Sequence, residues 1–183
     1  MITPEERETA LKLLDQTQER VLNLLRGLSP DQALYRPEPG CWSVAENVEH
    51  LVITERRLMA RIKKLLQEPP DLATQCSNTD DDLLSRVGTV TRRVQAPDFA
   101  VPTLRWSTDS LPQEFAAARA RTRDFARTTT ADLRRYFIRH FVFGDVDGYQ
   151  WLLFISGHAQ RHSAQAEAVK ASQGFPVQEA ASR

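Results

Sequence analysis

The stretch 149–166 constrains the fold more than any other part of this chain. Its first half is apolar except for Gln150, and the spacing of apolar residues predicts a long helix. The unbroken apolar run 151–155 extends around that helix, so the helix is expected to be buried over most of its surface. A helix that is buried on most sides belongs inside a helical domain, with other helices packed around it.

The second half of the same stretch carries two of the four histidines, His158 and His162. A spacing of four residues places both imidazoles on one face of a helix, about 6 Å apart along the axis. Such a pair can bind one metal ion, at about 2.0–2.1 Å from each nitrogen for zinc. The alternative is two polar residues on a solvated face, because a short motif is weak alone. Burial of the helix favours the metal, since each buried ring nitrogen needs a partner.

Charge and composition exclude several classes of protein. Lysine plus arginine (24) balances aspartate plus glutamate (24), so the charge gives no support to a nucleic-acid or membrane partner. No apolar run approaches the length of a membrane span. Residues 1–6 are polar and acidic, which predicts no signal peptide and a cytoplasmic protein. Cys41 and Cys76 are too few for a disulfide framework.

Helix-start signals mark the other long helices. Thr3 with Glu6, and Ser43 with Glu46, have the spacing of a capping box, and Gly27 predicts the end of the first helix. Asp147 is expected to cap the last helix, with Gln150 at the reciprocal position. The four predicted helices cover approximately residues 4–27, 44–67, 111–128 and 148–171.

The remaining segments connect these helices. Residues 67–108 read as a long crossover, in which Thr79 and the following aspartates start a short helix that runs to about Val94. Residues 131–147 read as a second irregular passage, and residues 174–183 as a frayed tail. Four long helices without a strand pattern predict an all-α four-helix bundle, as a single domain spanning residues 1–183.

Bundles build metal sites from side chains on facing helices, which brings in His50 on the second helix. Together with His158 and His162 it would make a three-histidine site with positions left open for water or substrate. Loop His140 is expected to be a hydrogen-bonded structural histidine rather than a fourth ligand. Arg161 is expected to be a surface charge that points away from the pair.

Two motifs of the chain resemble the signatures of the DinB/YfiT-like superfamily. The first is Trp-Ser-Val-Ala-Glu at residues 42–46 followed by His50-Leu51; the second is His140-x-x-x-Gly144, Tyr149-Gln150-Trp151 and His158-x-x-x-His162-x-x-Gln165. The resemblance covers essentially the whole chain. It departs from the family at Phe141, where relatives commonly have proline.

The resemblance implies a DinB-like bundle with a long crossover between the second and third helices, often assembled as a homodimer. It implies metal ligation by His50, His158 and His162, with zinc or nickel as the first expectation and iron or manganese as alternatives. It also implies a hydrolase, or a transferase acting with a low-molecular-weight thiol such as bacillithiol or mycothiol, on a small-molecule substrate. The alternative is a non-catalytic, stress-related or ligand-binding bundle, which a plugged pocket beside the histidines would favour.

Overall fold

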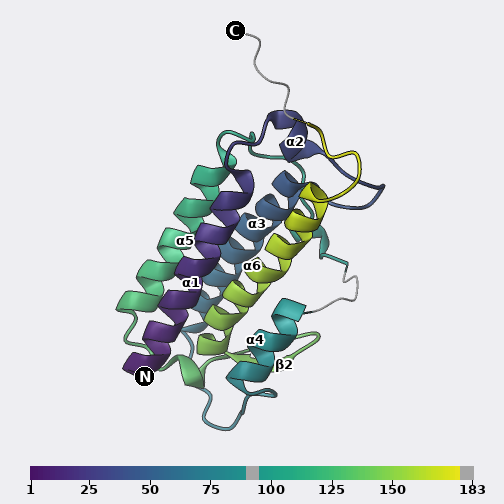
Figure 1. Cartoon of the computed structure of the whole chain (residues 1–183). Helices are drawn as coiled ribbons and strands as arrows, with labels where there is room; N and C mark the ends of the chain where they lie inside the picture. Colours follow the sequence, from purple (N-terminus) through teal and green to yellow (C-terminus); the bar gives the residue numbers. More distant parts are fainter. Residues whose placement is uncertain (90–94, 178–183) are drawn as a thin grey trace.

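The computed structural model describes residues 1–89 and 95–177. Four long helices lie side by side in it (Figure 1): α1 (Pro4–Leu25), α3 (Val44–Leu65), α5 (Leu111–Thr128) and α6 (Gly148–Lys170). Helix α6 packs against α1 and α3, and α5 packs against the same two helices from the other side. This arrangement confirms the all-α four-helix bundle, and the long crossover between α3 and α5 is present as expected.

The predicted caps form hydrogen bonds. Thr3 with Glu6 and Ser43 with Glu46 both make complete capping boxes, and α2 (Pro30–Leu34) begins with a third. Asp147 accepts the backbone N–H of Gln150 at 2.7 Å, as expected. The side chain of Gln150 does not reciprocate; it donates to the carbonyl of Asn78 at 2.9 Å instead. The side-chain caps satisfy N–H groups that have no partner within the helix, so helix starts are readable from local sequence.

Helix α6 is the most enclosed of the long helices, with packing from α1, α3 and α4. Buried apolar side chains lie along much of its first half: Tyr149, Trp151, Leu152, Leu153 and Ile155. Each large apolar side chain buried in this way contributes about 1.5–3 kcal/mol. Within the described ranges, none of the helices has both the length and the apolar character needed to cross a membrane.

A buried ion pair joins the three other long helices. Arg119 of α5 is fully buried and donates to the Glu55 carboxylate of α3 at 3.0 Å. The same guanidinium donates to the carbonyl of Leu14 and the hydroxyl of Thr17, both on α1 and both at 2.7 Å. The Glu55 carboxylate is therefore committed to Arg119.

The crossover between α3 and α5 contains helix α4 (Asp80–Thr89) and a turn of 3-10 helix, η1 (Asp98–Ala100). Thr79 caps α4 by accepting the backbone N–H of Asp82 at 3.2 Å. The predicted end of this helix near Val94 lies outside the described residues. Helix α4 approaches α6 closely at Gly157, where a Cβ atom would lie only 3.0 Å from Val87 Cγ1. The crossover therefore lies against the bundle on the side of α6.

The prediction that residues 131–147 are irregular is wrong. After the turn η2 (Leu133–Arg135), strands β1 (Phe137–His140) and β2 (Gly144–Asp147) pair in antiparallel register. His140 pairs with Gly144, so residues 141–143 form the loop, and β2 begins at Gly144 with a φ of +72° that glycine adopts without strain. Strands of four residues are too short to show a two-residue period, and the apolar loop residues Phe141 and Val142 hide the boundary.

Candidate metal centre

Packing of α3 against α6 brings together the three histidines identified from the sequence. His50 comes from α3, and His158 and His162 come from α6, one turn apart. One ring nitrogen from each residue lies within 4.8 Å of the other two. The Nε2 atoms of His50 and His158 are 3.3 Å apart. Residues far apart in the chain therefore direct imidazole nitrogens to one point between two helices.

Hydrogen bonds on the outer ring nitrogens fix the orientation of two of these imidazoles. His50 Nδ1 lies 2.7 Å from the carbonyl of Ala100, which can only accept, so Nδ1 carries the proton. His162 Nδ1 lies 2.9 Å from Oδ1 of Asn47, whose Nδ2 donates to the carbonyl of Ser43. His162 Nδ1 must therefore also donate. Both residues present an unprotonated Nε2 to the common point, as neutral imidazoles do when they bind a metal.

The spacing of these nitrogens matches a metal-ligand set. Two ligands at 2.0–2.1 Å from a tetrahedral zinc ion are about 3.3–3.4 Å apart, by the geometry of the tetrahedral angle. The His50–His158 separation of 3.3 Å agrees with that value. His158 is partly buried, whereas His50 and His162 are buried. Three protein ligands would leave one position of a tetrahedral ion open for water or substrate, whereas structural zinc sites have four protein ligands.

The surroundings keep all three imidazoles neutral. Burial is the main cause that lowers the pKa of His50, and it lowers the pKa values of His158 and His162 well below the usual range. The neighbouring imidazoles lower the last two pKa values further. A neutral imidazole keeps its lone pair free, so protons do not compete with a metal ion for these nitrogens at neutral pH.

Arg161 differs from the prediction. Expected to be a surface charge pointing away from the pair, it is half-buried, and its positive charge lowers the pKa of all three histidines. Arg161 follows His158 by three residues, a spacing that makes the two neighbours on the helix surface.

Aromatic rings form walls on two sides of the histidines. Trp42 lies 4.8 Å from His50 and 5.9 Å from His162 between ring centroids, and stacks on the latter. Phe154 stacks on His158 at 5.5 Å, with the planes 18° apart. These rings exclude water from part of the site and restrict the imidazole orientations.

His140 lies in a second aromatic cluster and does not join the triad. Its ring is 5.3 Å from Phe154 and 4.8 Å from Phe143. Its Nδ1 accepts the backbone N–H groups of Val142 and Phe143, at 3.0 and 3.3 Å. The prediction of a hydrogen-bonded structural histidine is confirmed, since the imidazole closes the loop between β1 and β2.

The cysteines lie outside the centre. Both are free, and Cys76 Sγ donates to the carboxylate of Asp147 at 3.1 Å. Burial, together with that carboxylate, raises the pKa of the Cys76 thiol to about 12, so this thiol stays protonated and poorly nucleophilic.

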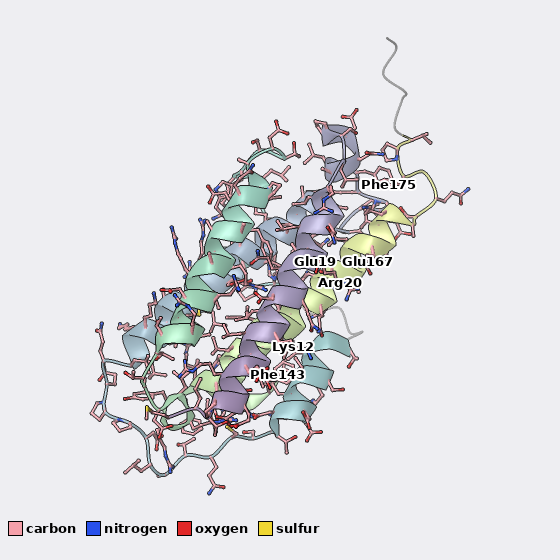
Figure 2. The ribbon with its side chains drawn as sticks, turned by 60° about the vertical axis from the view of Figure 1, so that its left-hand side comes forward. Lys12, Glu19, Arg20, Phe143, Glu167 and Phe175 are labelled. Atoms are coloured by element: carbon pink, nitrogen blue, oxygen red, sulfur yellow. The ribbon has the colours of Figure 1, made fainter. Side chains whose placement is uncertain are left out.

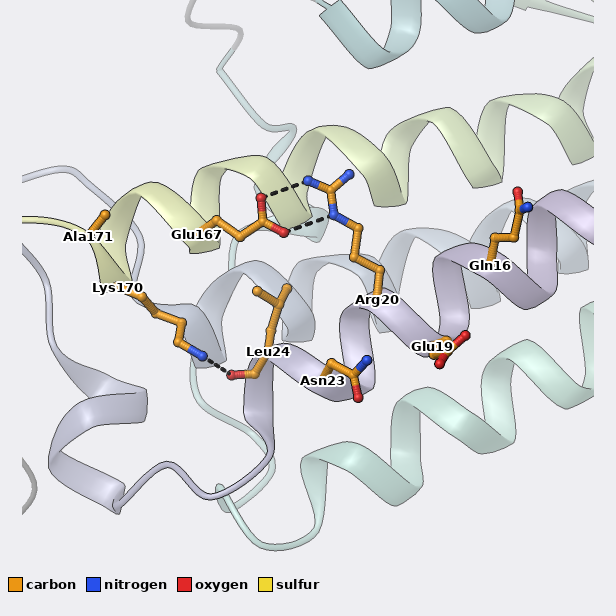
Figure 3. A pocket seen from close by; sticks show the side chains of 8 residues that line it. All are labelled: Gln16, Glu19, Arg20, Asn23, Leu24, Glu167, Lys170 and Ala171. Atoms are coloured by element: carbon orange, nitrogen blue, oxygen red, sulfur yellow. Dashed lines mark hydrogen bonds and ion pairs between the residues drawn. The ribbon is translucent and has the colours of Figure 1, made fainter.

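A surface groove between α1 and α6 is lined by none of the three histidines (Figure 3). Arg20 of α1 forms two hydrogen bonds with Glu167 of α6, at 2.9 and 2.7 Å, and Lys170 donates to the carbonyl of Leu24. The Arg20–Glu167 pair connects the two helices at the surface of the bundle (Figure 2). We interpret this groove as a solvated helix seam, because its basic side chains are already bonded to the protein.

Sequence reasoning missed the outer partners of the imidazoles. Asn47 precedes His50 by three residues, so the two share a helix face, and that spacing was an available signal. Ala100 accepts through its backbone carbonyl, a group that every residue has, so its residue type gives no signal in the sequence.

Comparison with known proteins agrees with this architecture. Over 159 residues the chain is 26% identical to the uncharacterized protein YuaE of Bacillus subtilis (strain 168), covering 81% of this chain and 89% of YuaE. Its fold is similar to that of YfiT from Bacillus subtilis, with a TM-score of 0.64, 15% identity, and coverage of 93% and 89% of the two chains. A conserved protein from Enterococcus faecalis matches with a TM-score of 0.57 and 18% identity, covering 89% and 94%. The DinB superfamily profile matches residues 13–166, and the chain therefore belongs to the DinB superfamily.

Proposed function

We propose that this protein binds one divalent metal ion through His50, His158 and His162, and uses it to act on a small-molecule substrate as a hydrolase. The observation that carries the proposal is the convergence of Nε2 atoms, 3.3 Å apart for His50 and His158. At that distance the lone pair of His50 Nε2 faces either a cation shared by both nitrogens or a proton on His158 Nε2. Zinc and nickel suit such a set of imidazoles, and iron is an alternative. Manganese, which prefers oxygen ligands, is the weakest candidate.

Neutral ligands leave the charge of the ion undiminished, so a bound ion would lower the pKa of a water ligand toward 7, or deprotonate a bound thiol. The protein holds the ligand rings in place and limits the access of water. Ala100 and Asn47 hold the rings of His50 and His162, while Trp42 and Phe154 keep bulk water from two sides. A fixed ligand set at a partly dry site is what metal-assisted hydrolysis requires of its protein.

The fold relative YfiT is described as a probable metal-dependent hydrolase with an unusual four-helix bundle topology. That description supports a hydrolytic reaction here, because the two chains share a fold over most of their lengths. Transfer to a low-molecular-weight thiol is the second reaction that the same centre could carry out, since a metal-bound thiol is a ready nucleophile. We also propose that the protein assembles as a homodimer.

Metal content tests the first step. The protein would be purified without a histidine tag, and its metals measured by inductively coupled plasma mass spectrometry. We expect about one divalent ion per chain, and its loss in His50→Ala, His158→Ala and His162→Ala. His140→Asn is the matched control, because His140 is a nearby histidine outside the triad whose loop-closing acceptor asparagine can replace. Metal loss in the control alone, or full metal content in all three alanine variants, would refute the site.

Turnover tests the second step. Chelator-treated protein would be reloaded with zinc or nickel and assayed for hydrolysis of p-nitrophenyl acetate and for conjugation of bacillithiol to an electrophile. Hydrolysis that returns with the metal supports the hydrolase; conjugation alone supports the thiol transferase. A protein that binds metal but catalyses neither reaction would be a ligand-binding bundle.

A further inference from the structure

We propose that Glu49 is a positioning residue for the metal ligand His50, because its buried carboxylate holds the crossover segment 98–105 in the place where Ala100 can accept the proton of His50. This inference rests on the proposed metal site and adds a coupling between the crossover and metal affinity. Glu49 does not touch the point where the imidazoles converge; it acts through the segment that it binds.

The His50 end of this coupling is a single backbone hydrogen bond. Nδ1 of His50 lies 2.7 Å from the carbonyl oxygen of Ala100, which ends the 3-10 turn η1. Ala100 itself is fully buried, so this carbonyl is not free to be replaced by water without movement of the turn. The position of segment 98–105 therefore determines both the tautomer and the direction of the His50 ring.

The Glu49 end is a cluster of three bonds to one oxygen. Oε1 of Glu49 accepts the backbone N–H of Thr103 at 3.0 Å, that of Arg105 at 3.4 Å, and Nε of Arg105 at 3.0 Å. The Glu49 side chain is only 1% exposed, whereas that of Arg105 is 42% exposed. A carboxylate buried to this degree needs donors, and the segment provides them.

The backbone between these donors has an unusual conformation. Leu104 has a φ of +55°. Among the described residues, no other non-glycine residue has a positive φ. Residues with a branched side chain avoid this region, so the conformation persists only where surrounding contacts impose it. With Leu104 in this conformation, the N–H groups of its two neighbours, Thr103 and Arg105, both donate to one carboxylate oxygen. That oxygen belongs to Glu49, which explains why the segment adopts the conformation.

The segment is also held by the buried residues Ala100 and Pro102 and by a contact at Phe99. Phe99 is 48% exposed and lies under the guanidinium of Arg57, 4.2 Å from its ring centroid. Glu49 and His50 are adjacent on α3, and each holds a different part of segment 98–105. Loss of the Glu49 bonds would therefore free the 103–105 end, and the Ala100 carbonyl would lose its fixed position.

Metal affinity measures this coupling. Partners of metal-bound histidines typically change the affinity 10–100-fold when they are removed. A bound ion strengthens the His50 Nδ1–H donor, so by linkage it should also stabilise segment 98–105. We expect zinc to slow amide hydrogen exchange in that segment, and we expect Glu49→Ala to abolish the effect.

The experiment compares Glu49→Ala and Glu49→Gln with the wild type and with a control, Glu114→Ala. Glu114 pairs with Arg56 and is 35% exposed, so its loss removes an ion pair without releasing segment 98–105. Zinc affinity would be measured by competition with a chromophoric chelator, and segment protection by hydrogen exchange with and without zinc. Thermal unfolding of the metal-free protein reports stability separately.

Glu49→Ala should weaken zinc binding about 10–100-fold, and Glu49→Gln should weaken it only several-fold, because its amide oxygen still accepts the two N–H groups but carries no charge for Arg105. The control should bind like the wild type. A Glu49→Ala protein that is less stable yet binds zinc within about twofold of the wild type would show a purely structural role and overturn the inference. If Glu49→Ala does not fold, Glu49→Gln decides: without the Arg105 ion pair it should bind several-fold more weakly, and unchanged binding and protection refute the coupling. A wild type that binds no metal would instead refute the proposed function.

Discussion

Replacement of Asn47 by leucine tests the tautomer argument directly. Asn47 is buried, and its Oδ1 accepts the Nδ1 proton of His162 at 2.9 Å. Its Nδ2 donates to the carbonyl of Ser43 at 2.9 Å. Leucine has a similar volume and no polar atom, so the variant leaves the Nδ1–H group of His162 buried without its partner. The ring can then move its proton to Nε2, the nitrogen that faces the other imidazoles.

Two magnitudes follow from these contacts. An unpaired buried N–H group costs about 1–3 kcal/mol, which should appear as a lower free energy of unfolding of the metal-free protein. Loss of an outer partner typically weakens metal binding 10–100-fold, or about 1.4–2.7 kcal/mol. The zinc-bound protein should lose both amounts, because the ion requires the tautomer that Asn47 stabilises.

Chelator competition measures the zinc affinity. Urea unfolding with and without zinc measures the free energy of unfolding. Asn23→Leu is the matched control: the same chemical change on α1, at an exposed residue in the groove of Figure 3. Asn47→Asp keeps an acceptor and should bind zinc more tightly than Asn47→Leu. If Asn47→Leu binds zinc within about twofold of the wild type, the assigned tautomer of His162 does not matter and the reasoning fails.

Three further predictions concern the scaffold. Arg119→Met leaves the Glu55 carboxylate buried without its partner and should lower the free energy of unfolding in urea by about 3–5 kcal/mol; a loss below about 1 kcal/mol would show that water replaces the guanidinium. Gly157→Ala pushes a methyl group against Val87 and should cost about 1–3 kcal/mol by the same assay, with faster hydrogen exchange in α4; unchanged exchange there would contradict the close packing. Burial lowers the pKa of His140 from 6.5 to about 4, so the unfolded chain binds the proton first, and stability falls as pH drops through that window. The shift corresponds to about 3 kcal/mol, which solvent screening at this part-exposed ring reduces to about 1–2 kcal/mol. His140→Asn should lose that much less stability than the wild type between pH 7 and pH 4, and equal acid sensitivity would refute the assignment.

Local signals predicted the long helices well. Thr3, Ser43 and Asp147 each cap a helix as expected, because a cap is a contact between residues three apart. The hairpin at residues 137–147 was missed, since pairing of two four-residue strands depends on contacts between segments rather than on either one alone. The partial burial of Arg161 was missed for a related reason: burial depends on which segments pack around a residue.

The sequence predicted the three histidines of the candidate centre, but it did not predict the hydrogen-bond partners of their rings. His158 and His162 share a helix face by their spacing, and His50 was chosen by motif and by the rule that bundles use facing helices. Local sequence thus decided which side chains could meet, because helix periodicity is a property of consecutive residues. Packing of α3, α6 and the crossover decided the distance between the imidazoles, the acceptors at Asn47 and Ala100, and the role of Glu49. Those contacts join residues up to 115 positions apart, so they exist only once the chain has folded.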